Sequence, residues 1–359
     1  MVDGHYAYIG HISGPEGTTI VDVSDPKHPR KVWSCEIARG LHSHKARAAY
    51  GIMLVNHEID PGVYIPAFHN LEGGIGIYDV SNPAQTKLIT VWKCAGKGVH
   101  RFTFDGRYAY ISPTMQGYRN NIVVILDLED PAQPREVCRW WMPGQWTAGH
   151  EPRTFKDAGA LEPRCHHPIR MGDRLYVSYW HGGGFILDIA DMARPKMLSH
   201  LPASAAFPWP THSLVPVPFS IHGHRWMLMA DEDVLPRNLG FEPEMPAFLW
   251  MVNITDETKP IPVGSFQVEG VNGAGLGPFT GCHQPVEDII GNEVPCAWFA
   301  QGLRIVDISN PHHLREVASY MPDPAAGKRV CSNDVFQDQR GLIYLIDRWR
   351  GMHIVERTG

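Results

Sequence analysis

The sequence predicts an all-β protein, a seven-bladed β-propeller whose blades are four-stranded antiparallel sheets. A short strand-like phrase recurs seven times, an aromatic-rich apolar segment precedes each copy, and long helical periodicity is absent from the sequence. The copies are spaced about 50 to 65 residues apart, which fits a blade of about 40–50 residues with loop insertions. Small repeated sheets around a central axis are the simplest closed arrangement for such units.

The recurring phrase places an acid or Asn between apolar residues and, in its complete form, ends in Ser-Asp-Pro or a close variant. The Ser or Asp side chain caps the turn, and Pro fixes φ and interrupts the hydrogen-bond ladder. The phrase therefore predicts a strand that ends in a turn. Complete copies occupy residues 20–26, 77–83, 125–131 and 305–311, degraded copies occupy 186–191 and 251–256, and a clipped copy occupies 354–356.

This phrase resembles the LVIVD repeat, which names a family of propellers, and the resemblance extends over nearly the whole chain. The resemblance implies the propeller fold. It implies no particular activity, because such repeats occur in proteins of many roles.

We expect residues 1–359 to form one propeller domain. With the strands of a blade named A to D from the axis outward, Met1 stands just before strand B of the first unit, and Gly359 follows strand C of the seventh. Strand A of the first blade and strand D of the seventh are therefore expected to be missing. Because open sheet edges are costly, we expect the natural chain to begin upstream of Met1 and to supply both strands.

Composition limits the partners of the protein. A net charge of −6 with 19% charged residues gives no sign of a nucleic-acid surface, and no apolar run approaches the roughly 18 residues of a membrane span. No secretory signal follows Met1, which favours the cytoplasm by default, but an upstream start leaves the compartment unknown. Seven cysteines at irregular spacing predict reduced, buried thiols rather than a disulfide framework. The oligomeric state is not indicated.

The chain contains 20 histidines, and five of them share one structural position. Strand A is the segment before each aromatic strand, and five of its six visible copies begin with His, while the sixth begins with Asn333. Because strand A lines the axial channel of a propeller, we expect these side chains to converge and to bind a metal through three or four nitrogens. The five predicted ligands are His44, His100, His167, His212 and His283.

The alternatives to a metal site are a metal-free polar plug of the channel and an anion site. A single buried histidine is usually a satisfied core residue, whereas five at one position would each need a partner in a narrow channel. A set of imidazoles without thiolate suits Fe, Cu, Mn or Zn. An open coordination position would leave room for water, dioxygen or a small-molecule substrate.

Several strands that follow the histidine positions end in polar residues. Glu58 could orient a ligand histidine or act as a base, and His181 ends the corresponding strand of the fourth blade. Arg101 could hold an anionic substrate. For each of these residues taken singly, the alternative to a functional role is an ordinary position in a solvated loop or on the surface. An acidic run at 231–233, His42, and the thiols Cys165, Cys282 and Cys331 complete the polar set near this end of the strands.

Three classes of function remain open. Residues 41–44, 179–188 and 331–334 resemble segments of the selenium-binding protein and methanethiol oxidase family, whose members are copper-dependent propellers. This resemblance implies an oxidase or oxygenase that acts on a small organic substrate. The second class is a lyase or hydrolase in which the metal acts as a Lewis acid. The third is a non-catalytic interaction module, which predicts a closed axis without metal.

Overall fold

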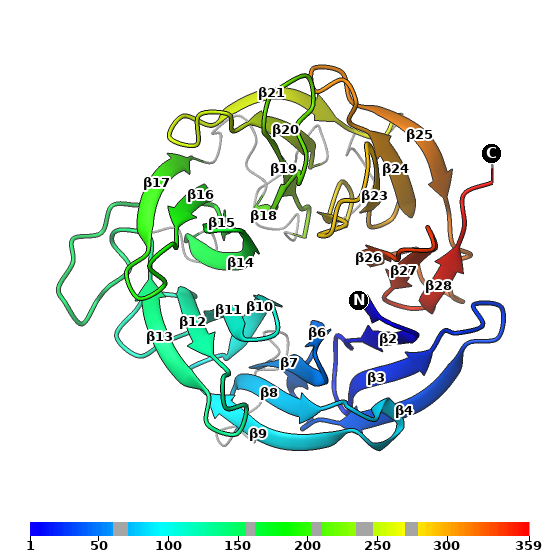
Figure 1. Ribbon diagram of the computed structural model, residues 1–359, viewed down its shortest axis with the longest axis horizontal. Coiled ribbons are helices and arrows are strands. Elements are labelled where there is room, and N and C mark those ends of the chain that lie inside the picture. Colours follow the sequence, from blue (N-terminus) through cyan, green and yellow to red (C-terminus); the bar gives the residue numbers. More distant parts are fainter. Residues whose placement is uncertain (60–70, 156–161, 203–209, 235–246, 270–278, 359) are drawn as a thin grey trace. The chain divides into compact units, whose positions relative to one another are not determined.

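The computed structural model describes residues 1–59, 71–155, 162–202, 210–234, 247–269 and 279–358 (Figure 1). These residues form seven antiparallel sheets that follow one another along the chain. The architecture is that of an all-β, seven-bladed β-propeller, which confirms the predicted fold class. The described ranges contain no α-helix, only the short 3-10 turn η2 (Pro83–Gln85). None of the elements described has the length and apolar character of a membrane-spanning helix.

The first three sheets lie within the first half of the sequence, and the second of them has a divided innermost strand, because β5 and β6 both pair with β7. The first sheet comprises β1 (Val2–Asp3), β2 (Tyr6–Ile9), β3 (Glu16–Asp22) and β4 (Arg30–Glu36); the second comprises β5 (Leu41–His42), β6 (Ala46–Ala49), β7 (Ile52–Ile59), β8 (Gly74–Asp79) and β9 (Lys87–Lys93); the third comprises β10 (Val99–Phe104), β11 (Tyr108–Pro113), β12 (Val123–Asp127) and β13 (Arg135–Trp140).

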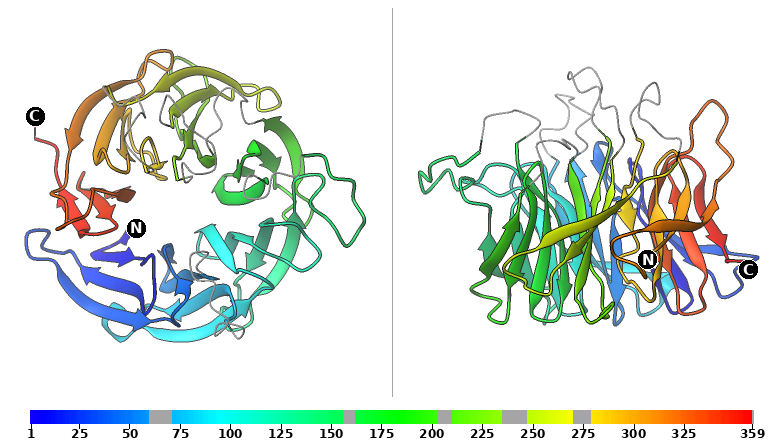
Figure 2. Two further views of the ribbon diagram at one scale, coloured as in Figure 1. Left: turned by 180° about the vertical axis from the view of Figure 1, so that it is seen from behind. Right: turned by 90° about the horizontal axis from the view of Figure 1, so that it is seen from above.

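The remaining four sheets follow the same order, and within each sheet the strands lie side by side (Figure 2). The fourth sheet comprises β14 (Arg164–Met171), β15 (Arg174–Trp180), β16 (Gly183–Asp188) and β17 (Lys196–Leu201); the fifth comprises β18 (Thr211–Pro216), β19 (Trp226–Asp231), β20 (Leu249–Asn253) and β21 (Ile261–Phe266); the sixth comprises β22 (Gln284–Pro285), β23 (Glu293–Ala297), β24 (Leu303–Asp307) and β25 (Arg315–Tyr320); the seventh comprises β26 (Ser332–Gln337), β27 (Ile343–Asp347) and β28 (Gly351–Val355).

The chain divides into two compact units. Unit 1 consists of Met1–Leu175 and Asp188–Lys196, and unit 2 consists of Tyr176–Leu187 and Met197–Gly359. Unit 1 contains the first three sheets, and unit 2 contains the last three. The expectation of a single domain stays a prediction.

The acid of the repeat phrase closes the turn between the third and fourth strands of a sheet. Asp22 accepts hydrogen bonds from the backbone N–H of Ser24 at 3.0 Å and from the Arg30 guanidinium at 2.8 Å. These bonds, led by those from Ser24, lower the pKa of Asp22 to about 2. Asp307 makes the same contacts with Ser309 and Arg315. The phrase thus caps a turn as expected from its composition.

The first sheet differs from the expectation in having four strands. The sequence predicts no strand A here, yet β1 pairs with β2, with Val2 opposite Ala7, and the Tyr8 N–H donates to Met1 O at 2.9 Å. A two-residue strand before a turn at Gly4, where φ is 56°, is too short to show an alternating pattern. In the seventh sheet the described residues form three strands, β26 to β28.

One hydrophobic cluster of unit 1 is built from the apolar faces of the second and third sheets. Leu54 of β7 is fully buried in a cluster with Ile77 of β8 and Phe102 of β10. Alternation along each strand puts these side chains on the faces that the two sheets share.

We predict that Leu54→Ala lowers the free energy of unfolding by about 2–5 kcal/mol, because it leaves a cavity in a closely packed cluster. The matched control is Leu88→Ala on β9, where Leu88 is 55% exposed, and it should stay within about 0.5 kcal/mol of the wild type. Urea unfolding followed by tryptophan fluorescence measures both. Equal midpoints for the two variants would contradict this assignment of the core.

Candidate metal centre

A cluster of histidines around one carboxylate forms in unit 1. His42 of β5 lies directly opposite Glu58 of β7 in the antiparallel register, so their side chains project from the same face of the sheet. His42 Nε2 is 2.5 Å from Glu58 Oε2. His100 Nδ1, from β10, is 2.6 Å from the same oxygen. Two imidazoles therefore bind one buried carboxylate oxygen.

His44 completes this group. Its ring centroid lies 4.6 Å from that of His42 and 4.8 Å from that of His100. One ligand atom from each of His42, His44, Glu58 and His100 can be chosen so that all four atoms lie within 4.8 Å of one another. Four potential metal ligands thus converge within one unit.

Asn56 of β7 supports the His44 segment. Its Oδ1 accepts from the Lys45 N–H at 2.8 Å, and its Nδ2 donates to Val99 O at 3.1 Å and lies 3.2 Å from His44 Nδ1. The His44 Nε2 atom is buried and makes no hydrogen bond within the described part of the chain. A buried nitrogen of this kind is an atom that a metal ion would satisfy.

His166 of β14 adds a further nitrogen. Its Nε2 is 2.9 Å from His100 Nε2, and the two ring centroids are 4.6 Å apart. Its neighbour His167 faces the other side of the strand, as alternation requires. Burial lowers the pKa of His167 well below its usual value, and the charges of Lys45 and Arg101 lower it further. Because the two residues face opposite sides of the strand, the structure brings His166, rather than His167, to His100.

The register of the innermost strands explains how His100 is aimed. Pairing of β10 with β11 shifts between Val99 and Phe102, so His100 lies in a bulge. A bulge inserts an extra residue and re-aims a side chain. The same kind of shift includes His212 in β18 and Asn333 in β26. Three of the six aligned positions are thus at irregularities in the innermost strand.

Burial and charge set the protonation states in this cluster. Burial opposes ionisation of Glu58, which is 3% exposed, but the charge and hydrogen bond of His100, together with His42, hold its pKa below the usual value. Burial lowers the pKa of His100 to about 4 despite Glu58, and it lowers the pKa of His44 and of His166 strongly. Glu58 is thus held ionised, and His44, His100 and His166 are held neutral, which is the metal-binding form of histidine.

The contact distances can be compared with the spacing expected between two ligands of one ion. Two N or O ligands on one tetrahedral ion, each about 2.0–2.2 Å from it, lie about 3.3 Å apart. The contacts of Glu58 at 2.5 and 2.6 Å are too short for this and are hydrogen bonds. The 2.9 Å between His100 Nε2 and His166 Nε2 is the length of a hydrogen bond, and it also equals the spacing of adjacent ligands about 2.05 Å from an octahedral ion. The residues present therefore fit a metal on the nitrogens, with Glu58 behind His100.

Arg101 of β10 is 2% exposed, and its backbone N–H is bound by Ser112 Oγ at 2.9 Å. Its charge contributes to lowering the pKa of His44 and of His167, so it lies close to both. The role predicted for Arg101, which is to hold an anionic substrate, stays a prediction.

A second group of polar residues lies in unit 2. The ring centroids of His212 and His283 are 4.0 Å apart, and His283 Nε2 is 3.5 Å from Glu232 Oε2. Glu232 follows β19 directly, in the acidic run 231–233. His181 follows β15 in a left-handed turn, with φ of 54°, and its ring packs edge-on against Trp180 at 6.1 Å. The roles predicted for these histidines stay predictions.

Sequence reasoning did not place His166 among the functional residues, and it gave His42 and the acidic run that contains Glu232 only a secondary position. The signal for Glu232 was available, because Glu232 lies at the end of the second strand of its sheet, as Glu58 does. No pattern distinguishes His166 from His167, since both have the same side chain.

All seven cysteines are free. Cys165, Cys282 and Cys331 are buried, and burial raises the pKa of each thiol, that of Cys331 to about 11. A thiol that stays protonated is a poor nucleophile and a poor metal ligand. These three residues therefore behave as small core side chains.

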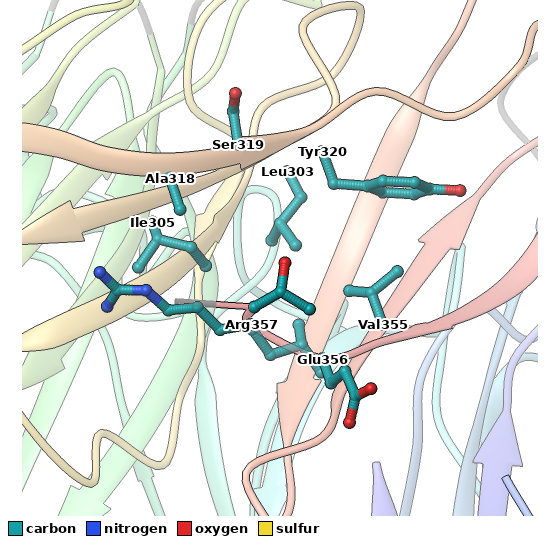
Figure 3. A pocket seen from close by; sticks show the side chains of 10 residues that line it. Leu303, Ile305, Ala318, Ser319, Tyr320, Val355, Glu356 and Arg357 are labelled. Carbon is teal, nitrogen blue, oxygen red and sulfur yellow. The ribbon is translucent and has the colours of Figure 1, made fainter.

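A cavity of about 410 Å³ lies in unit 2 between β25 and the terminal segment (Figure 3). Leu303, Ile305 and Val355 supply much of its apolar lining. Its charged residues are Glu356 and Arg357, and Arg357 pairs with Glu293. Its lining residues include no histidine or cysteine, so it offers no donor set comparable with the histidine cluster.

Comparisons with known proteins agree with the fold. The LVIVD repeat model matches residues 1–36 and 291–322. A protein of known structure from Lactobacillus plantarum is 11% identical, with a TM-score of 0.67 over 98% of this chain and 93% of that one. A hypothetical selenium-binding protein from Sulfolobus tokodaii is 14% identical, with a TM-score of 0.61 over 96% of this chain and 83% of that one. No curated protein sequence matches the chain.

At these identities the two structures establish a shared fold and nothing finer. The repeat match and the seven sheets agree with the phrase from which the fold was predicted. The chain is therefore a seven-bladed β-propeller that carries LVIVD repeats, with candidate histidine and glutamate metal-binding groups.

Proposed function

We propose that the protein is a metal-dependent oxidoreductase with a polyhistidine transition-metal centre in unit 1 and a small organic molecule as substrate. The observation that carries the proposal is the convergence of His42, His44, Glu58 and His100, whose ligand atoms lie within 4.8 Å of one another. Packing alone would not favour such a cluster, because each buried imidazole loses its hydration and then needs a hydrogen-bond partner or a metal ion.

Within this proposal His44, His100 and His166 supply nitrogens to the ion. Glu58 binds the far nitrogen of His100 and so holds its ring plane and tautomer, as carboxylates behind metal-bound histidines do. His42 donates to the same oxygen and fixes the carboxylate from the other side. Imidazole ligands suit Fe, Cu, Mn or Zn, of which Fe, Cu and Mn change oxidation state.

A redox-active ion bound here would supply electron transfer and an open position for dioxygen or substrate. Arg101 is a fixed positive charge beside the cluster, which favours an anionic or electron-rich substrate. Glu58 is a positioning residue. His181, in unit 2, stays a predicted catalytic residue for which the proposal gives no step.

The structural neighbour from Sulfolobus tokodaii supports the proposal weakly. It is named as a hypothetical selenium-binding protein, and it shares the propeller fold. The segment 41–44, which resembles that family, contains two histidines of the cluster. The inference therefore depends on the geometry of the cluster rather than on the neighbour.

The first prediction concerns metal content. Protein purified without a histidine tag should contain a transition metal, and His44→Ala and His100→Ala should each lose about one equivalent because each removes a ligand. His28→Ala is the matched control, since the His28 side chain is 81% exposed and pairs only locally with Asp25. Metal is measured by mass spectrometry after gel filtration. Unchanged content in both cluster variants would exclude this site.

The second prediction tests Glu58. Glu58→Gln keeps the size of the side chain but removes its charge, so it can no longer accept from both imidazoles as an anion. We expect metal affinity to fall about 10–100-fold, as for other residues that orient metal ligands. Competition with a chromophoric chelator measures the affinity, and Glu16→Gln, with an 80% exposed side chain, is the control. Equal affinities would remove Glu58 from the centre.

The third prediction concerns reaction class. The bound ion should give the electron paramagnetic resonance or charge-transfer spectrum of Cu, Fe or Mn, and these signals should change on reduction with dithionite. A spectroscopically silent ion such as zinc, bound at full occupancy in protein from cells with ample iron and copper, would favour Lewis-acid chemistry and would contradict the oxidoreductase assignment.

A further inference from the structure

We infer that unit 2 contains a second metal-binding site, formed by His212, Glu232 and His283, and that it takes a divalent first-row transition-metal cation. All three side chains are buried, with exposures of 0%, 3% and 3%. They lie in or directly beside strands of the fifth and sixth sheets and are distinct from the group of His42, His44, Glu58 and His100. The inference does not depend on the function proposed above.

The local backbone brings the three residues together. His212 lies in the bulge of β18, where pairing with β19 shifts between Thr211 and Ser213. Glu232 follows the last residue of β19, and His283 immediately precedes β22. A bulge beside two strand ends is an arrangement that re-aims side chains and is common next to active sites.

The distances fit ligands of one ion. His283 Nε2 is 3.5 Å from Glu232 Oε2, close to the roughly 3.3 Å expected between two ligands of a tetrahedral ion. The His212 ring centroid lies 4.0 Å from that of His283, and ligand atoms of His212 and Glu232 lie within 4.8 Å of each other. Small side-chain adjustments would place all three on one cation.

Each candidate ligand is also held from behind. His283 Nδ1 contacts the backbone carbonyl of Asn333; a carbonyl only accepts, so this nitrogen carries a proton, and in the neutral ring Nε2 presents its lone pair toward Glu232. His212 Nδ1 is 2.6 Å from Ser213 Oγ. Trp180 Nε1 donates to Glu232 Oε1 at 2.6 Å. Outer partners of this kind orient metal ligands and fix their tautomers.

A metal-free ion pair between protonated His283 and Glu232 is the competing explanation. Such a charge-assisted hydrogen bond would be about 2.7–2.9 Å long. The observed 3.5 Å is longer, in contrast to the 2.5 and 2.6 Å contacts of Glu58 in unit 1. The spacing in unit 2 therefore suits a cation between the two groups rather than a shared proton.

The donor set indicates the class of ion. Two imidazoles and one carboxylate are borderline-hard ligands that suit Fe²⁺, Co²⁺ or Zn²⁺, and three protein ligands leave at least one position for water or a small anion. The Phe299 ring, with its centroid 4.4 Å from that of His283, gives the site an apolar wall. Low polarity around a site strengthens the attraction between the carboxylate and the cation.

The test is a Co²⁺ titration of untagged full-length protein that has been stripped with a chelator, followed by d–d absorption and equilibrium dialysis. The wild type should bind about two equivalents. His283→Ala and Glu232→Gln should each bind about one fewer. Trp180→Phe removes only the indole N–H behind Glu232 and should weaken Co²⁺ binding at this site about tenfold or more, while circular dichroism checks that each variant is folded.

His224→Ala is the control in unit 2, because His224 is exposed, and it should bind as the wild type does. His44→Ala separates the two proposals. If it binds like the wild type while Glu232→Gln loses an equivalent, the unit 2 site stands and the unit 1 centre fails. The inference is overturned if Glu232→Gln, His283→Ala and Trp180→Phe all retain wild-type stoichiometry and affinity, or if the wild type binds only one equivalent in all and both His44→Ala and His283→Ala lose it.

Discussion

One buried carboxylate determines the geometry of the histidine cluster. Glu58 is 3% exposed, and a buried carboxylate is stable only where donors replace the water it has lost. His42 and His100 both bind its Oε2, so each ring has one nitrogen committed to the carboxylate and the other turned away from it. Glu58 thereby fixes the planes of two rings at once. His44 and His166 then pack against rings whose orientation is already set.

The fold could be predicted from sequence because each part of the repeat phrase has a local physical role. Asp22, for example, caps a turn through Ser24, so the phrase marks where a strand ends. The site was predictable only in part. Aligning the innermost strands found His44 and His100, which are in the cluster. The bulge that contains His100 adds a residue to the strand, and an alternating pattern does not reveal such an insertion.

Two further features lay beyond sequence reasoning. His166 and His167 are adjacent on β14, and a shift of one residue exchanges the faces on which they lie. In the acidic run 231–233, composition does not show which carboxylate meets a histidine. The structure distinguishes them by their donors: Trp250 binds the first, Trp180 binds Glu232, and Thr280 binds the third. Only Glu232 pairs with a histidine among the contacts described.

The two histidine groups show how one scaffold can hold similar residues for different electrostatic purposes. In each, a glutamate at the end of a sheet's second strand meets imidazoles from neighbouring strands. Glu58 makes two short hydrogen bonds, so the N–H groups of its partners replace the water that this buried oxygen has lost. Glu232 lies 3.5 Å from His283 Nε2, which carries a lone pair in the neutral ring, and two electron-rich atoms at that distance repel each other unless a cation lies between them. Because the sheets supply a similar framework in both places, the chemistry depends on whether the nitrogen that faces the carboxylate carries a proton.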